Sequence, residues 1–252
     1  MMARTLSTLL LMGLLAGCVT VTDKQSNVKF DSIDAAESRI ALGIAYLNAG
    51  QWERARENLE MAVQFAPRYY RSLISFAHYL QQVEEFEQAE EQYITALRYS
   101  PKNGDVQNNY GVFLCRQERY DEAQKAFAKA IAQPYYYKLS GSFENAALCA
   151  LKAGKTEDAK LWFAKAVDHE PNRPLSSVQL ARLEVKDNQF NDARLRLFKF
   201  HKRYGYRAGS LYTLIELEHK AERPSEVARY ANLLARQYPE SNEYRQYLAN
   251  EY

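Results

Sequence analysis

Alanine recurs at a nearly constant interval along most of this chain. Successive members of the main series are 34, 34, 36 and 34 residues apart, and a second series keeps the first three of these steps. The main series is Ala55, Ala89, Ala123, Ala159 and Ala193, and the second is Ala62, Ala96, Ala130 and Ala166. Antiparallel helices reach the short end of their usual separation, about 8 to 10 Å, only where small residues lie at the crossing. The spacing therefore predicts a repeated helical hairpin whose alanines mark the crossings.

Three other residue classes keep the same period. A bulky residue lies between the two alanines of each interval, a small residue lies in the preceding helix, and proline often follows the second alanine. The bulky residues are Leu59, Tyr93, Phe127, Phe163 and Leu197, and the small ones are Gly43, Ala77, Gly111, Ala147 and Ala181. A 34-residue helix-turn-helix unit is typical of tetratricopeptide (TPR) repeats. The chain is therefore predicted to be all-α. It resembles a right-handed TPR superhelix of about six repeats, in which each repeat is stabilised by stacking on the neighbouring repeats.

The register divides the predicted TPR domain, residues 34–252, into units. Repeats are expected near 36–69, 70–103, 104–139, 140–173, 174–207 and 208–241, with a short C-terminal helix to 252. Two extra residues lengthen the loop before the fourth repeat, which holds Tyr135, Tyr136 and Tyr137. These tyrosines could contact a partner or pack beneath the longer loop, and the sequence is compatible with both roles.

The first eighteen residues differ in kind from the repeats. Arg4 gives a positive start, and an apolar run from Leu6 to Leu15 has the length of a signal-peptide core, too short to span a bilayer. The run ends in Leu15-Ala16-Gly17-Cys18, which resembles the lipobox of bacterial lipoproteins. Residues 1–17 are therefore predicted to be a lipoprotein signal peptide, and Cys18 to be lipidated.

Residues 18–33 are polar and lack a helical period, so they are predicted to form a flexible tether between the lipid and the repeats. Val19 follows the cysteine where lipoproteins retained at the inner membrane usually carry Asp. The resemblance to lipoproteins therefore implies a lipid-anchored protein on the periplasmic face of the outer membrane.

Motifs for catalysis or cofactor binding are missing from the sequence. His78, His169, His201 and His219 have no partner at metal-ligand spacing, and Gly154-Lys155-Thr156 lacks the glycine that a phosphate-binding loop requires five residues earlier. A formal charge of +2 provides no field for a nucleic acid. We therefore expect no enzyme activity, no cofactor, no metal, no small-molecule substrate and no nucleic acid partner.

Cys115 and Cys149 are the cysteines that remain after Cys18. They fall in the first helices of consecutive repeats, which are neighbours in a TPR stack. A disulfide requires Cα atoms about 4.4 to 6.8 Å apart, and neighbouring helices are often further apart than that. A disulfide and two buried thiols are both compatible with the sequence.

The first helices of TPR repeats line a concave surface, and positions 2, 5, 9 and 12 of each unit are expected to face it. The surface is predicted to be mainly apolar, which suits an amphipathic helix or an extended segment of a partner. Its candidate residues are Ile40, Ile44, Leu47, Ile74, His78, Asn108, Asn109, Val112, Leu148, Leu151, Val178 and Arg182. Only Asn109 matches the residues with which other TPR domains clamp a terminal carboxylate.

The lipobox, the short tether and six TPR units filling the remaining chain together resemble the PilF/PilW lipoproteins of type IV pilus biogenesis. Membership implies a pilotin, an outer-membrane lipoprotein that binds the pilus secretin subunit and promotes its localisation and multimerisation. Two alternatives share the architecture. They are a TPR scaffold for cell-wall hydrolases and a TPR lipoprotein of outer-membrane barrel insertion, which typically has five repeats.

Overall fold

The computed structural model describes residues 31–250, and this range contains thirteen α-helices and no strand. The helices are α1 (Ser32–Asn48), α2 (Trp52–Phe65), α3 (Tyr70–Gln82), α4 (Phe86–Tyr99), α5 (Gly104–Arg116), α6 (Tyr120–Ile131), α7 (Leu139–Lys152), α8 (Thr156–His169), α9 (Pro174–Lys186), α10 (Phe190–Tyr204), α11 (Ala208–Lys220), α12 (Pro224–Gln237) and α13 (Asn242–Leu248). The protein is an all-α TPR solenoid.

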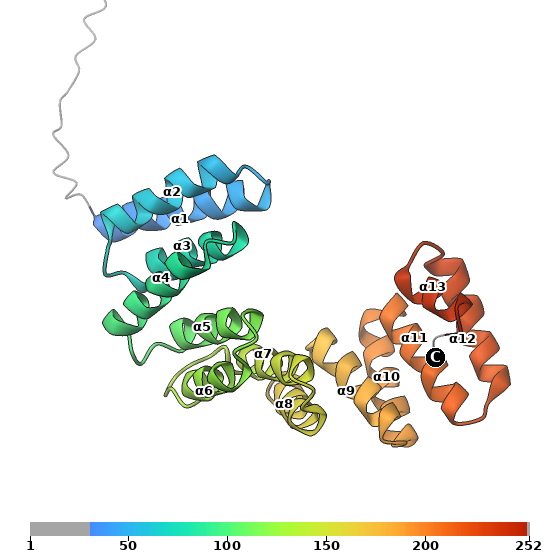
Figure 1. Cartoon of the computed structure of the whole chain (residues 1–252). Helices are drawn as coiled ribbons and strands as arrows, with labels where there is room; N and C mark the ends of the chain where they lie inside the picture. The colour runs from blue at the N-terminus through green and yellow to red at the C-terminus, as the bar shows by residue number, and fades with distance from the viewer. Residues whose placement is uncertain (1–30, 251–252) are drawn as a thin grey trace, which may run out of the picture. The chain divides into compact units, whose positions relative to one another are not determined.

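Each odd-numbered helix up to α11 packs against the next helix as a hairpin, and six hairpins follow one another in chain order (Figure 1). The second helix of each hairpin also packs on the first helix of the next. The short helix α13 packs on α11 and α12, so it covers the last hairpin. Each repeat buries its apolar surface mainly against its neighbours, as expected for a solenoid.

Small residues lie at the helix crossings, as the alanine series predicts. All nine alanines of the two series are fully buried. The glycines of the first helices are equally constrained, because a Cβ on Gly43 would lie 2.5 Å from Cγ of Leu59, and one on Gly111 would lie 2.7 Å from Cε1 of Phe127. The bulky residue of the second helix therefore occupies the space that a larger side chain would need.

The turn inside each repeat contains one residue with positive φ. These residues are Gly50, Glu84, Glu118, Gly154, Asn188 and Glu222, with φ between 55° and 73°. They occur at the repeat period, and each lies just past the C-terminal end of a first helix, where the left-handed conformation commonly terminates helices. Gly154 of the Gly154-Lys155-Thr156 sequence therefore belongs to a hairpin turn.

The start of the first helix differs from the sequence expectation. The helix α1 begins at Ser32, so residues 32 and 33 are helical and do not belong to the predicted tether. Asp34 lies in the first turn of α1, where a negative charge stabilises the helix N-terminus.

The lengthened loop before α7 combines a packed tyrosine with two exposed ones. The Tyr136 ring packs so closely on Gly104 that a Cβ on this glycine would lie 2.5 Å from Cδ2 of the ring, while Tyr135 and Tyr137 are exposed. The loop thus both packs and presents two aromatic rings.

Candidate partner-binding surface

The first helices carry the predicted groove residues, and their exposure divides these residues into two groups. Ile44, Ile74, His78, Asn108, Asn109, Val112, Leu148, Leu151, Val178 and Arg182 are partly accessible. Ile40 and Leu47 are only 5% and 8% exposed. The assignment of these last two to an open surface is therefore wrong, because Ile40 packs with Ala36 and Ala62, and Leu47 belongs to the largest core cluster.

The accessible aliphatic residues are half in the core. Ile44, Ile74 and Val112 pack against the largest cluster, and Leu148 and Leu151 pack against the cluster formed by α7, α8 and α9. Val178 on α9 is partly accessible and is not part of a core cluster of the described residues. A partner on this surface would therefore contact the edges of aliphatic side chains whose stems are already held in place.

His78 lies among these aliphatic residues on α3. Burial, together with the positive charge of Arg116, lowers the pKa of His78 below its usual value. The imidazole is therefore neutral at pH 7 and adds a polar but uncharged group to the surface.

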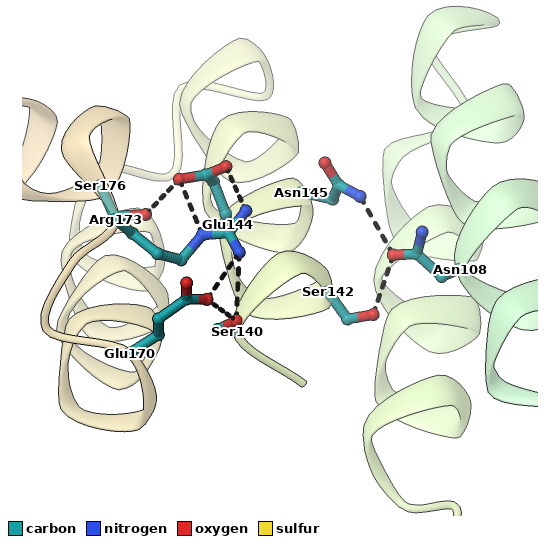
Figure 2. A network of polar contacts seen from close by, with 8 residues as sticks. All are labelled: Asn108, Ser140, Ser142, Glu144, Asn145, Glu170, Arg173 and Ser176. Atoms are coloured by element: carbon teal, nitrogen blue, oxygen red, sulfur yellow. Dashed lines mark hydrogen bonds and ion pairs between the residues drawn. The ribbon is translucent and has the colours of Figure 1, made fainter. Parts of the chain in front are cut away.

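Asn108 and Asn145 form an amide pair between α5 and α7 (Figure 2). The Oδ1 atom of Asn108 accepts hydrogen bonds from Asn145 Nδ2 at 3.1 Å and from Ser142 Oγ at 2.9 Å. The Asn108 side chain is thereby held at a fixed orientation across two repeats. Its own Nδ2 group and the Oδ1 group of Asn145 take no part in these bonds, so the pair keeps a donor and an acceptor.

A second polar cluster joins α7 to the start of α9 (Figure 2). The guanidinium of Arg173 donates to Glu144 Oε1 at 2.8 Å, and Ser176 Oγ donates to Glu144 Oε2 at 2.6 Å. Ser140 and Glu170 complete the cluster through Arg173 Nη1 and a 2.6 Å hydrogen bond from Ser140 to Glu170. Burial alone would raise the pKa of Glu144, but the hydrogen bonds from Arg173 and Ser176 outweigh it and hold this pKa below its usual value. Glu144 is therefore ionised at neutral pH.

Two predicted polar residues are used within the fold. Asn109 Nδ2 donates to the backbone oxygen of Asp105 at 2.8 Å, so this amide is directed along its own helix. Arg182 on α9 lies beside Glu216 on α11, with 3.5 Å between Nε and Oε2. These contacts engage Asn109 and Arg182 within the fold, so neither side chain is free to act in a carboxylate clamp.

Most members of the polar clusters were not among the predicted site residues, although the sequence contained a signal for them. The repeat register places Ser72, Ser142, Ser176 and Ser210 at equivalent positions, and all four are buried. Buried hydroxyl groups usually have hydrogen-bond partners. Ser142, Ser176 and Ser210 bond to side chains of the preceding repeat, whereas Ser72 Oγ has no hydrogen-bond partner among the described residues. The recurring serine is therefore only a partial signal for polar contacts between repeats, and it does not identify Glu144 or Asn108 as the partner.

Cys115 on α5 and Cys149 on α7 form a disulfide bond, with 5.8 Å between their Cα atoms. The bond joins the first helices of the third and fourth repeats, on either side of the lengthened loop. Both cysteines belong to the largest core cluster. The disulfide therefore crosslinks the region that carries the Asn108–Asn145 pair.

Cys18, the signal peptide and almost all of the predicted tether lie outside the described residues. Within residues 31–250, none of the helices combines the length and apolar character needed to cross a membrane. The same residues contain no cluster of side chains suited to a metal ion.

The stacked hairpins, the small-residue crossings and the accessible first helices define a TPR scaffold, a class that generally acts through protein contacts and not through catalysis. The tetratricopeptide repeat family model matches residues 74–137. The chain is 34% identical over 237 residues to the type IV pilus assembly protein PilF of Pseudomonas aeruginosa, covering 93% of this chain and 94% of that protein. The chain therefore belongs to the PilF family of TPR proteins.

Solved structures agree with this assignment. The structure of Pseudomonas aeruginosa PilF superimposes with a TM-score of 0.73 at 32% identity, covering 87% of this chain and 99% of that chain. PilW, described as a widely conserved type IV pilus biogenesis factor, gives a TM-score of 0.74 at 24% identity over 84% of this chain and 98% of that chain. The second comparison supports the fold alone.

Proposed function

We propose that this protein is a lipid-anchored TPR lipoprotein of the outer membrane that acts in type IV pilus biogenesis as a pilotin. It binds the pilus secretin subunit through its first-helix surface and promotes secretin localisation and multimerisation. The observation that carries the proposal is the 34% identity to PilF over nearly the whole chain, which spans the repeats and reaches into the N-terminal segment.

The chemistry of the first-helix surface supports a protein ligand. The first helices carry partly accessible aliphatic residues, such as Ile74, Val112 and Val178, and the Asn108–Asn145 amide pair. Apolar edges can contact side chains of a partner segment, and the remaining amide donor and acceptor can bond to its backbone. Because hydrogen bonds from Ser142 and Asn145 already hold the Asn108 side chain in place, this side chain loses little conformational entropy when a partner binds.

Binding through this surface is tested with Val178→Ser and Asn145→Ala. Neither change removes a core side chain, so we expect secretin capture on immobilised protein to weaken about tenfold or more while the melting temperature moves by only a few degrees. Ile94→Ser is the matched control, since Ile94 is 45% exposed on the second helix α4. Normal capture by both variants would place the secretin interface elsewhere, and equal loss by the control would show that the effect is not local.

Delivery by the lipid is tested with Cys18→Ala in the full-length chain. The variant is expected to fold, because the repeats begin well after this residue, and to leave secretin multimers at the inner membrane in fractionated cells. Normal outer-membrane multimers would contradict the lipid-delivery step. Crosslinking that recovered cell-wall hydrolases or barrel-insertion components without secretin would favour one of the alternative scaffolds.

A further inference from the structure

A cavity lies mainly on the second helix of the fifth repeat, and none of the predicted groove residues lines it. It has a volume of about 820 Å³ and is lined mainly by α10, with the end of α8, the α8–α9 turn and the side of α9 completing it. Val167, Pro171, Leu195 and Phe200 supply apolar lining, and Leu195 is 54% exposed, so the cavity is open to solvent along α10. Its volume falls within the range of about 300 to 1,000 Å³ typical of binding pockets.

Exposed leucines in the fourth and fifth repeats occupy a position that is charged in the other repeats, and one of them, Leu195, lines the cavity. Leu161 on α8 and Leu195 on α10 are 52% and 54% exposed and occupy equivalent positions, 34 residues apart. The same position holds Glu57, Glu91, Lys125 and Arg229 in the other four repeats. One turn beyond Leu195, Phe198 is 65% exposed. Large exposed apolar residues grouped on two adjacent repeats indicate an interaction site more strongly than scattered ones do.

Positive charge lines one end of this cavity. Lys199, Lys202 and Arg203 lie in the second half of α10 and line the cavity, and within residues 31–250 none of them forms an ion pair. The cavity also contains Asp168 and Asp192, of which Asp192 lies in the first turn of α10, seven residues before Lys199. Glu184 is already bonded to Arg196. With Glu184 and Arg196 paired, three cations and two aspartates remain, so the lining keeps an excess of positive charge, and its cations lie in the C-terminal half of α10.

We propose that the cavity between α8 and α10 is a second docking site, which binds a short acidic amphipathic helix from a partner protein. Apolar side chains of this helix enter the cavity beside Leu195 and cover Phe198, and its carboxylates face Lys199, Lys202 and Arg203. The charge complementarity favours an acidic segment, and a recessed cavity admits individual side chains that a planar membrane surface does not supply. The site is separate from the first-helix surface, so one protein can hold two segments.

The experiment uses the full-length chain and a dye-labelled 15-residue helical peptide with leucines on one face and glutamates on the other. Fluorescence anisotropy is expected to show saturable binding that weakens as salt is raised. A peptide with lysine in place of each glutamate is expected to bind at least tenfold more weakly. Absence of saturable binding, or equal binding of the two peptides, overturns the proposal.

Variants locate the binding. Lys199→Glu with Lys202→Glu is expected to lower the affinity for the acidic peptide at least tenfold, as is Leu195→Ser. The matched charge control is Lys125→Glu with Lys129→Glu, two exposed lysines on the second helix α6. The apolar control is Ile94→Ser. An equal loss in the controls overturns the assignment to this cavity.

Two further measurements distinguish a separate peptide site from a shared secretin surface and from a lipid contact. Secretin capture by the Lys199→Glu, Lys202→Glu variant is expected to be normal, which would show that peptide binding does not depend on the first-helix surface. Loss of both secretin capture and peptide binding in this variant would contradict a separate site. Sedimentation with vesicles containing phosphatidylglycerol tests the membrane alternative. Vesicle binding that needs Lys199 and Lys202, combined with peptide binding that does not, overturns the proposal in favour of a lipid contact.

Discussion

The first four repeats and the last two differ in the residue type at one position of the first helix. One position of the first helix holds Tyr46, Leu80, Leu114 and Ala150 in repeats one to four, and Glu184 and Glu218 in repeats five and six. The glutamates are as buried as the residues they replace, at 5% and 1% exposure against 0% for Leu80 and 1% for Leu114. A position that is apolar in one region therefore carries a buried charge in the other.

Arginines of the following helices and turns compensate the two glutamates. Arg196 bonds to Glu184, with 2.7 Å between Nη2 and Oε1, while Glu218 accepts from Arg194 at 2.8 Å and lies 3.2 Å from Arg223. Buried ion pairs contribute little net stability, because desolvation offsets the attraction, but removing one partner is costly. The last two repeats therefore contain buried ion pairs that require a specific arginine partner. The first four repeats are held instead by the largest apolar cluster, which extends from Leu47 to Cys149 and ends in repeat four.

The sharpest test moves the charge of the last repeats into the first region. Leu114→Glu buries a carboxylate next to Arg119, which is already paired with Glu90 and Glu122. The new charge therefore gains no free cation, and we expect a loss of about 4 kcal/mol or more in the free energy of unfolding. Urea denaturation followed by far-UV circular dichroism measures this loss. A variant as stable as the wild type would show that the two regions are not packed differently.

The disulfide is a covalent feature of the first region alone. Replacing Cys115 and Cys149 with Ser should lower the free energy of unfolding by about 3 to 4 kcal/mol, because the bond closes a loop with a sequence separation of 34 residues. The same denaturation experiment on wild-type protein treated with a reductant is the control, and it should match the double variant. An unchanged midpoint after reduction would mean that the bond does not form in solution.

In the second region, Glu218→Gln removes a charge while keeping the side-chain shape. We expect a loss of about 2 kcal/mol, because Arg194 and Arg223 lose their common partner but are 33% and 49% exposed and can turn toward water. Thermal melts of this variant are compared with Glu85→Gln. Glu85 pairs with Arg56 at 30% exposure, so its loss should cost roughly 0.5 kcal/mol. Equal effects would remove the distinction between buried and surface pairs.

The smallest expected effect is a pH dependence located on α10. Burial lowers the pKa of His201 to about 4, and Ser210 Oγ lies 2.9 Å from its Nε2. Because the unfolded histidine has a pKa near 6.5, the unfolded chain binds the extra proton as pH falls from about 6.5 to 4, and stability falls with it.

His201→Gln removes this contribution. The difference in unfolding free energy between pH 7 and pH 4.5 should therefore be smaller in the variant than in the wild type, on the order of 1 kcal/mol after allowance for partial exposure. Identical pH profiles for the His201 variant and the wild type would contradict the lowered pKa.

The repeat architecture follows from the order of the residues alone. The crossing alanines, the bulky residues that face Gly43 and Gly111, and the turn residues from Gly50 to Glu222 all recur at one period, because each depends on contacts within a hairpin or with the next one. Such contacts are short in sequence and therefore leave a pattern. The resemblance to the PilF family followed from that pattern together with the lipobox.

Which side chains meet across helices depends instead on the packing of the folded chain. The Cys115–Cys149 bond requires a distance between α5 and α7 that spacing alone does not provide. Arg173 and Glu144 are 29 residues apart and meet only because α9 begins beside α7. Ile40 and Leu47, which the register assigned to the groove, are buried because they pack into core clusters of the folded chain. These contacts depend on distances of a few ångströms between packed helices, and the repeat period of the sequence does not specify those distances.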